Sequence, residues 1–350
     1  MTENRPTPLP TDPTWIKKFN AAVGPTDTKQ QQHLANKMEI KYKGGVGELI
    51  WAMTTCRPDI SFTSVKLSQS NSAPAEHHYH GLKHAIRYVY ITRHDGIYFW
   101  RTKPRDELPV GPLPTINSNI KDLLLDGRPQ HDADIAVAYG DSDWATCVKT
   151  RRSFSGICIQ LAGGTIAYKT KFQPTVALSS TEAEFMAACD VGRMCLFVRS
   201  ILWDLDIPQE AATVAYEDND GCTSMGNAQK PTPRTRHIDI KYFALCDWVE
   251  RDLIILERID TSINPADHLT KILTRTLFHR HADFLLGHVP PKYSPVYRQA
   301  LTTYGNCYTD IDTFVPESFT TPTSARAARI FAPTNDDIQG NPWLFVLWHE

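Results

Sequence analysis

Four acidic residues, each at the edge of a predicted strand or helix, have the types and spacing needed for chemistry. Asp141 follows an apolar strand (IAVAYG), and Glu184 opens a helix (STEAEFMAACDVG). Asp218 ends a second strand (TVAYEDN), and Asp267 lies in the first turn of a late helix (NPADHLTK). Clustered carboxylates repel one another unless cations lie between them, so this set predicts a site for two divalent ions. Two such ions can activate a water and stabilise the leaving oxygen of a phosphodiester, so we expect hydrolysis of nucleic acid.

Three of these acids also have an ordinary structural explanation. Asp141 and Asp143 lie two apart on a strand and therefore share a face, where both could be solvated acids. Asp218 could form an Asx turn at a strand end. Asp267 follows Asn264-Pro265, a pattern typical of a helix cap, and an acid three residues later is favoured by the helix dipole alone.

Two glutamates at the start of the long helix compete for the role of ligand. Ser179-x-x-Glu182 and Thr181-x-x-Glu184 both match a capping box, in which the glutamate bonds to a free backbone donor. Glu184 heads a stripe of small and apolar residues suited to packing on a sheet, which places its carboxylate at the sheet edge. We therefore assign the metal to Glu184 and the cap to Glu182.

A meander of three strands, followed by alternating helices and strands, must position these acids. Residues 132–171 predict the three strands, with Gly163-Gly164 as the tight turn between the second and third. A long amphipathic helix follows at about 181–205. The remaining elements are a strand at 213–218, a helix around 237–251, a strand at 253–259 and terminal helices. The pattern predicts an α/β fold with a mixed five-stranded sheet flanked by helices.

Three helical segments upstream predict a small bundle. The first has apolar residues at spacings of three and four over GVGELIWAMTTC, the second begins at Arg57-Pro58, and the third runs from about Pro74 to Thr92. A short strand, GIYFWR, follows. The residues predicted to face inward are Val46, Leu49, Ile50, Met53, Leu82, Ala85, Ile86 and Val89.

Composition is that of an ordinary globular protein, with 41% apolar and 22% charged residues. The net charge of −2 means that nucleic acid must be bound by local basic patches. The eight cysteines form no CxxC pair, which argues against a zinc ribbon and for reduced thiols inside a cell. The sequence shows neither a signal-peptide pattern nor an apolar run of bilayer length, so we expect an intracellular protein without a membrane partner.

Several strings resemble the end of the Pol polyprotein of copia-type LTR retrotransposons. GDSDWATCVKTRRSFSGICIQLAGGTIAYKTKFQPTVALSSTEAEF is similar to the start of the ribonuclease H domain in that family. YEDND, RTRHIDIKYF and INPADHLTKIL are similar to its remainder, in the same order. Upstream, YKGGVGELIWAMTTCRPDISFTSVKLSQ and HHYHGLKHAIRYVYITRHDGIYF resemble the reverse transcriptase thumb and connection. The likeness covers roughly residues 36–103 and 133–288.

The resemblance implies a ribonuclease H-like fold that cleaves the RNA strand of an RNA–DNA hybrid. It implies two Mg²⁺ ions, with Mn²⁺ as a substitute, and Asp143 as an outer neighbour of the metal site. His237 and His268 lie nearest these motifs and are candidates for proton transfer, although a solvated or core histidine is the commoner role. The catalytic and metal-binding residues are then Asp141, Glu184, Asp218 and Asp267.

Basic residues gather in two groups where a hybrid could lie. Contact with phosphates would be independent of sequence and weakened by salt, whereas the alternative is a solvated surface. The residues predicted to bind nucleic acid are Lys149, Arg151, Arg152, Lys169, Lys171, Arg234 and Arg236.

We predict five segments along the chain. They are a mostly disordered lead-in at 1–35, a thumb/connection-like helical region at 36–103, a linker at 104–131, a ribonuclease H-like domain at 132–288 and a Pro/Thr/Ser-rich tail at 289–350. The Tyr-x-Asp-Asp metal site of such polymerases is absent from the sequence. We therefore expect a Pol fragment without polymerase activity, for which the palm and fingers would be a partner, in the cytoplasm (virus-like particles) or the nucleus.

Two other functions stay open. A catalytically inactive or co-opted retrotransposon remnant would keep the fold and bind nucleic acid or a protein partner. DNA cleavage by the same carboxylates is the third possibility, and the strings SSTEAE and RTRHIDI argue against it.

Overall fold

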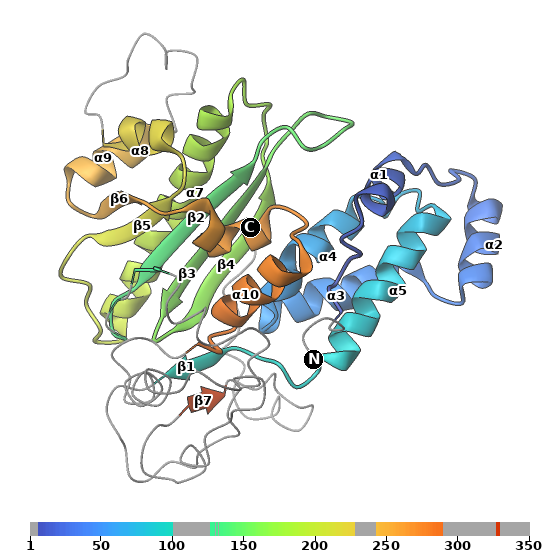
Figure 1. Cartoon of the computed structure of the whole chain (residues 1–350), viewed down its shortest axis with the longest axis horizontal. Helices are drawn as coiled ribbons and strands as arrows, with labels where there is room; N and C mark the ends of the chain where they lie inside the picture. Colours follow the sequence, from blue (N-terminus) through green and yellow to red (C-terminus); the bar gives the residue numbers. More distant parts are fainter. Residues whose placement is uncertain are drawn as a thin grey trace, which may run out of the picture.

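A mixed five-stranded sheet forms one half of the computed structural model, which describes residues 6–100, 127–129, 131, 133–227 and 243–289 and the backbone of 327–329. The strand order is β4-β3-β2-β5-β6 (Figure 1). β2, β3 and β4 are antiparallel neighbours, and β5 and β6 continue the sheet in parallel from β2. This order confirms the predicted α/β class and the ribonuclease H-like fold. The strands are β2 (Val137–Asp143), β3 (Phe154–Leu161), β4 (Gly164–Phe172), β5 (Thr213–Glu217) and β6 (Ile254–Arg258).

The turn between β3 and β4 lies one residue earlier than predicted. Leu161 pairs with Gly164, so Ala162 and Gly163 are its central residues, with φ of 52° and 76°. Positive φ at both positions is the geometry of a two-residue hairpin turn. Gly164 begins β4, and a Cβ there would approach the carbonyl oxygen of Tyr98 to 2.3 Å. The second glycine is therefore needed for packing rather than for the turn.

Helices cover both faces of the sheet, as the alternation of the strands requires. Ala138 and Ile157 face α7 (Ser180–Asp204), α8 (Asp220–Gly226) and α9 (Ala244–Glu250) in one apolar core. Tyr139 and Cys158 face the opposite way, toward η5 (Thr261–Ile263), η6 (Pro265–Leu269) and α10 (Arg275–Leu285). The two-residue periodicity of β2 thus separates two cores.

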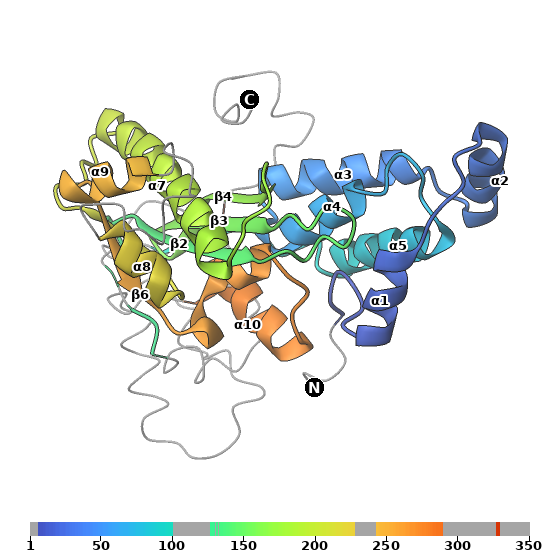
Figure 2. The same cartoon turned by 90° about the horizontal axis from the view of Figure 1, so that it is seen from above.

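A helical bundle lies beside the β4 edge of the sheet (Figures 1 and 2). Its elements are α1 (Pro13–Ala21), α2 (Thr28–Met38), α3 (Tyr42–Thr55), η2 (Pro58–Ile60), α4 (Ser61–Ser68) and α5 (Glu76–Ile91). After the bundle, β1 (Tyr98–Trp100) pairs with β7 (Ala327–Arg329). All eight residues predicted to face inward are buried or packed against the bundle core, which confirms the helical periodicity. Of the described helices, none has the length and apolarity needed to cross a membrane.

The prediction of a disordered lead-in is wrong for the described part of residues 1–35. Asp12 and Asp27 cap α1 and α2, since their carboxylates accept bonds from Trp15 N at 2.7 Å and Gln30 N at 3.0 Å. Phe19 is 3% exposed and packs against Gly81 of α5. α1 has only nine residues, too few for a helix that is stable by itself, so its order comes from packing on α5, about 60 positions away in the sequence.

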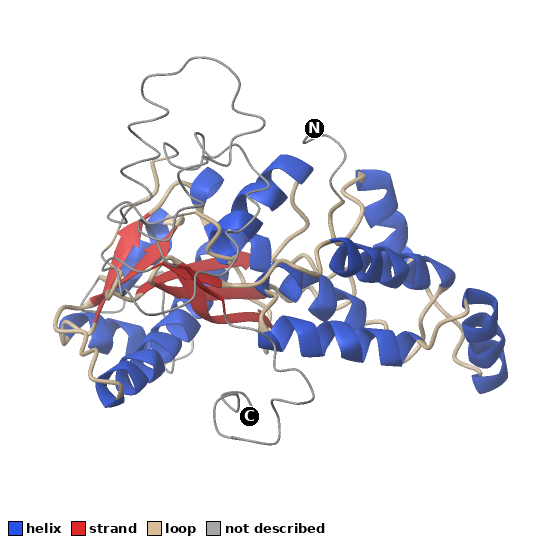
Figure 3. Ribbon diagram, turned by 90° about the horizontal axis from the view of Figure 1, so that it is seen from below, coloured by secondary structure: helices blue, strands red, loops and turns tan. Residues whose placement is uncertain are grey.

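In Figure 3 the red strands, flanked by blue helices, lie in one half of the molecule, and the bundle in the other half contains helices without strands. The two halves share a core. Leu273, Phe278 and Ala282, from α10 and the segment before it, are buried together with bundle residues such as Leu49 and Tyr88. The predicted regions 36–103 and 132–288 therefore pack directly on each other. The predicted linker (104–131) and tail (289–350) lie almost entirely outside the described residues, and the segment boundaries stay predictions.

A buried ion pair anchors this junction. Arg57 donates to both carboxylate oxygens of Asp59 at 2.8 and 2.6 Å, and the Tyr88 hydroxyl donates to the same carboxylate at 2.7 Å. Burial alone would raise the pKa of Asp59, but the Arg57 charge and these hydrogen bonds hold it below its ordinary value. Asp59 is therefore ionised and fully paired although its side chain is 0% exposed.

We expect Asp59→Asn to destabilise the protein by about 3–5 kcal/mol, because it leaves the buried Arg57 charge without a counter-charge. Urea denaturation followed by circular dichroism measures the loss. Glu76→Gln is the matched control, since it removes the exposed ion pair with Lys37 and should change stability little. Equal effects of the two substitutions would contradict a special role for the buried pair.

Candidate metal centre

Asp141, Glu184 and Asp218 meet where β2 and β5 part. The two strands pair in parallel at Ala138–Ala215 and Tyr139–Tyr216, after which β5 ends and β2 continues along β3 to Asp143. Each of the three acids places one carboxylate oxygen within 4.8 Å of the others. The structure therefore brings together three of the four acids that the sequence singled out.

Glu184 reaches the strand ends because α7 lies close on β2. A Cβ at Gly140 would approach Val191 Cγ2 of α7 to 3.0 Å, so the missing side chain admits the helix. At the start of α7, Ser179 caps the helix by accepting from Glu182 N at 3.1 Å, and the Glu182 carboxylate accepts from Leu178 N at 2.7 Å. Glu182 performs the predicted capping, and Glu184 points its carboxylate into the cluster.

Asp267 lies beside the three-acid group rather than in it. Asn264 caps η6 by accepting from Ala266 N at 3.1 Å, and Pro265 is the first helical residue, as predicted. The Asp267 carboxylate is 2.9 Å from Lys271 Nζ, and the same ammonium is 3.8 Å from Asp141 Oδ2. A lysine cation therefore lies between two of the predicted metal ligands.

Sequence reasoning missed three residues of the site. The Thr270 hydroxyl donates to Asp141 Oδ2, and Lys271 pairs with Asp267 at helical spacing of four. Both belong to the string INPADHLTKIL, where this spacing was visible. Glu217, next to Asp218, is 1% exposed, and neither of its oxygens has a hydrogen-bond partner among the described residues. Alternation along β5 directs it to the α7 side, where Gly140 makes room for its carboxylate.

The charges of the cluster are strongly coupled. Burial raises the pKa of Glu184, and the charges of Asp141 and Asp218 raise it further. Burial and Glu184 raise the pKa of Glu217 in the same way. Burial and Asp141 raise the pKa of Asp267 to about 8, although Lys271 opposes the shift. Burial and mutual repulsion thus oppose ionisation of Glu184, Glu217 and Asp267.

The donor set fits a hard divalent cation. Carboxylate oxygens are the protein ligands that Mg²⁺ prefers, and Glu184 Oε2 is buried without a hydrogen-bond partner among the described residues. Asp143, the predicted outer neighbour, shares the face of Asp141, and burial raises its pKa to about 6. A divalent ion would offset both the burial and the mutual repulsion that raise these pKa values.

Of the two predicted proton-transfer histidines, the structure describes only His268. His268 is 3% exposed, and its Nε2 lies 2.8 Å from the backbone carbonyl oxygen of Asp59, away from the acids. Burial lowers the pKa of His268. The side chain points into the junction with the bundle, and its assignment to proton transfer stays a prediction. His237 lies outside the described residues.

The described basic residues form two neighbouring groups. Lys149 and Arg151 are exposed in the loop after β2, and Arg152 lies over the ring of Phe172 at the end of β4, 6.0 Å from its centroid. Lys171 on β4 is 3.0 Å from Asp190 of α7, so it already has an anionic partner. Lys169 is two residues away on the same face. Arg234 and Arg236 lie outside the described residues.

No protein-family model matches the sequence. Among curated proteins, the retrovirus-related Pol polyprotein from transposon TNT 1-94 of Nicotiana tabacum is 28% identical over 261 residues, 75% of this chain. That from transposon RE1 of Arabidopsis thaliana is 30% identical over 252 residues, 72% of this chain. The chain belongs to the copia-type family of retrovirus-related transposon Pol polyproteins. It spans 15–17% of the length of these two relatives.

The chain is also similar to an effector protein and to solved ribonuclease H structures. Secreted RxLR effector protein 161 of Plasmopara viticola is 34% identical over 148 residues, which are 42% of this chain and 84% of that protein. Among solved structures, LC11-RNase H1 from compost is 14% identical with a TM-score of 0.30, over 39% of this chain and 93% of that one. The N-terminal RNase H domain of a Mycobacterium tuberculosis protein is 13% identical with a TM-score of 0.29, over 39% and 89%.

Without divalent ions, we expect the contribution of Asp267 to stability to fall as pH rises from about 4 to about 8. The unfolded chain releases this proton near pH 4, whereas the folded protein holds it until about pH 8. Between these values the folded state binds more protons, so the free energy of unfolding decreases with pH. Thermal unfolding in EDTA across this range measures the trend.

Mg²⁺ should reverse this loss at about pH 8, because it binds the ionised cluster. Glu184→Gln replaces a buried carboxyl group whose ionisation is costly with a neutral amide, so its Tm in EDTA should exceed that of the wild type and should rise less with Mg²⁺. An equal rise in Tm for the two proteins would contradict a metal centre at Glu184.

Proposed function

We propose that this chain hydrolyses the RNA strand of RNA–DNA hybrids at the cluster of Asp141, Glu184 and Asp218, using divalent ions. The observation that supports the proposal most is the meeting of three carboxylates, two of them buried, at the end of β2 in a ribonuclease H-like sheet. Membership of the Pol polyprotein family favours a hybrid of RNA and DNA as the substrate.

Asp141, Glu184 and Asp218 would hold Mg²⁺, and Asp267 would complete a site for a second ion. When bound, such ions activate a water and stabilise the departing 3′ oxygen of a phosphodiester. Thr270 fixes the carboxylate of Asp141 through its hydroxyl. α7, which packs closely on β2 at Gly140, and η6 hold the ligands from the two faces of the sheet.

The hybrid would lie along the basic loop after β2. Lys149, Arg151 and Arg152 lie six to nine residues after Asp143 in the sequence, so phosphates bound there would place the strand near the acids. Lys169 and Lys171 would extend this contact over the neighbouring end of β4, with Arg234 and Arg236 as further candidates. Such contacts neutralise phosphates, so binding should weaken as salt rises. The proposal covers hydrolysis only; DNA synthesis would belong to the palm and fingers of Pol as a partner.

A catalytically inactive, co-opted protein is the second candidate. The observation that favours it is the similarity to Secreted RxLR effector protein 161, which is matched over 84% of its length. In that case the fold would bind nucleic acid or a protein, and the acids would have no catalytic task. An assay for hydrolysis of an RNA–DNA hybrid distinguishes the two candidate functions.

The first experiment is cleavage of a labelled RNA–DNA hybrid by the full chain in Mg²⁺. Asp218→Asn should reduce the rate roughly 100-fold or more, since even groups that only orient metal ligands are worth 10–100-fold. Asp220→Asn is the matched control, two residues away, because Asp220 is 85% exposed and pairs with Arg258. It should cleave like the wild type.

Absence of Mg²⁺-dependent cleavage by the folded wild-type chain would favour the inactive candidate. Cleavage that Asp218→Asn leaves intact would show that another site, or a contaminant, is responsible.

Lys271→Met should raise the affinity for Mn²⁺ roughly tenfold. Lys271 Nζ lies within 4 Å of Asp141 and Asp267, so its charge repels a second cation by an amount on the order of 1–2 kcal/mol. Isothermal titration with Mn²⁺ measures the change. Lys171→Met is the control, since Lys171 has a similar exposure and pairs with Asp190 instead. Weaker Mn²⁺ binding in Lys271→Met would contradict competition and assign Lys271 a supporting role.

A further inference from the structure

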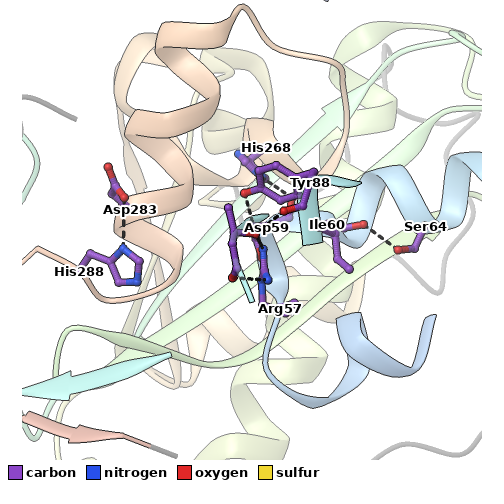
Figure 4. Close-up of polar contacts among 9 residues, drawn as sticks. Arg57, Asp59, Ile60, Ser64, Tyr88, His268, Asp283 and His288 are labelled. Atoms are coloured by element: carbon purple, nitrogen blue, oxygen red, sulfur yellow. Dashed lines mark hydrogen bonds and ion pairs between the residues drawn. The ribbon is translucent and has the colours of Figure 1, made fainter. Parts of the chain in front are cut away.

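His268 connects the metal centre to the helical bundle (Figure 4). It follows Asp267 on η6, and its Nε2 lies 2.8 Å from the carbonyl oxygen of Asp59. A carbonyl oxygen only accepts, so Nε2 carries the proton and donates it. This bond joins residues 209 positions apart in the sequence.

The acceptor of this bond is held rigidly. The Asp59 side chain accepts from Arg57 and Tyr88 (Figure 4). Arg57 also donates to the carbonyl oxygen of Thr92 at 3.0 Å and to its hydroxyl at 2.7 Å. These bonds tie η2 to both ends of the last turn of α5. The carbonyl of Asp59 is therefore fixed by a buried network that belongs entirely to the bundle.

The ring of His268 is also packed from the side of α10. Its centroid lies 4.5 Å from that of Phe278, which in turn makes an edge contact with Tyr88 at 5.7 Å. The imidazole thus has its polar edge on Asp59 and its face on an aromatic ring that the bundle also contacts. Both contacts restrict where η6 can lie.

On its other side, η6 is held by the sheet. Asn264 donates to the carbonyl oxygen of Gly140 at 2.8 Å, and Thr170 donates to that of Leu269 at 2.8 Å. A Cβ at Gly156 would approach the carbonyl oxygen of Ala266 to 2.7 Å, so η6 lies directly on β3. The short helix is wedged between sheet and bundle, with Asp267 toward the acids and His268 toward Asp59.

We propose that the Arg57–Asp59–Tyr88 network, acting through His268, is a positioning element of the metal centre. Asp267 and His268 are consecutive on one short helix, so a rotation of η6 that breaks the bond to Asp59 also displaces Asp267 and its partner Lys271. The bundle then does more than extend a nucleic-acid surface, because it sets the geometry of the carboxylates. The catalytic part of this inference rests on the proposed ribonuclease function, whereas the effect on metal binding does not.

The test compares His268→Leu with His268→Gln in the full chain. Leucine removes the donor and leaves no buried charge, and glutamine keeps an N–H that can donate to Asp59. Mn²⁺ titration should show affinity weakened roughly tenfold in His268→Leu and largely restored in His268→Gln. In hybrid cleavage, kcat should fall in His268→Leu while KM for the hybrid stays unchanged, since the phosphate contacts lie elsewhere.

A second pair of variants keeps the test decisive if His268→Leu does not fold. Tyr88→Phe and Tyr42→Phe each remove one buried tyrosine hydroxyl from the bundle, with bonds of 2.7 Å to Asp59 and 2.9 Å to the carbonyl oxygen of Leu67. Only Tyr88 belongs to the network. The Mn²⁺ affinity should therefore fall in Tyr88→Phe and stay at the wild-type value in Tyr42→Phe.

Wild-type Mn²⁺ affinity and kcat in a folded His268→Leu would overturn the inference, as would equal shifts in the two tyrosine variants. A wild type that binds Mn²⁺ but cleaves no hybrid would instead refute the proposed function. The weakened Mn²⁺ binding of the variants would in that case still support the positioning role.

Discussion

The fold brings several carboxyl groups close together, where they repel one another. The rest of the structure must offset this repulsion. Asp141, Glu184 and Asp218 meet at one end of the sheet, with Glu217 and Asp267 beside them. Burial raises the pKa of Glu184, Glu217, Asp218 and Asp267. A protein folds around such a cluster only if the rest of the chain stabilises it or if cations balance it. Lys271 supplies one positive charge from within, and in the proposed function divalent ions would balance the remaining negative charge.

Elements packed on both faces of the sheet hold these carboxyl groups in place. α7 approaches closely at Gly140 and brings Glu184, and η6 approaches at Gly156 and brings Asp267. Neither glycine adopts a positive φ, so each is required for space rather than for backbone conformation. Thr270, Asn264 and Thr170 then fix η6 by hydrogen bonds to the strands and to Asp141. Because α7 and η6 are held firmly on the two faces of the sheet, their carboxyl groups stay close together despite their mutual repulsion.

The helical bundle takes part in this support. Residues of α10 complete the core of the bundle, and the buried Arg57–Asp59 pair lies directly behind η6. A division of the chain into a thumb-like region and a hydrolase domain describes its sequence better than its packing. The two regions share apolar residues, a buried ion pair and one hydrogen bond that ends next to Asp267.

The sequence by itself determined the strands, the long helix, the caps and three members of the cluster, because these follow from period-two and period-3.6 patterns and from local capping chemistry. It also determined the family, because strings such as SSTEAE and INPADHLTK are specific. Only the tertiary structure decided that Glu217 joins the cluster, that Lys271 lies between Asp141 and Asp267, and that His268 faces Asp59. It also decided that residues 13–21 and 28–38 are helical. Each of these depends on contacts between segments far apart in the chain, whose distances no local pattern encodes.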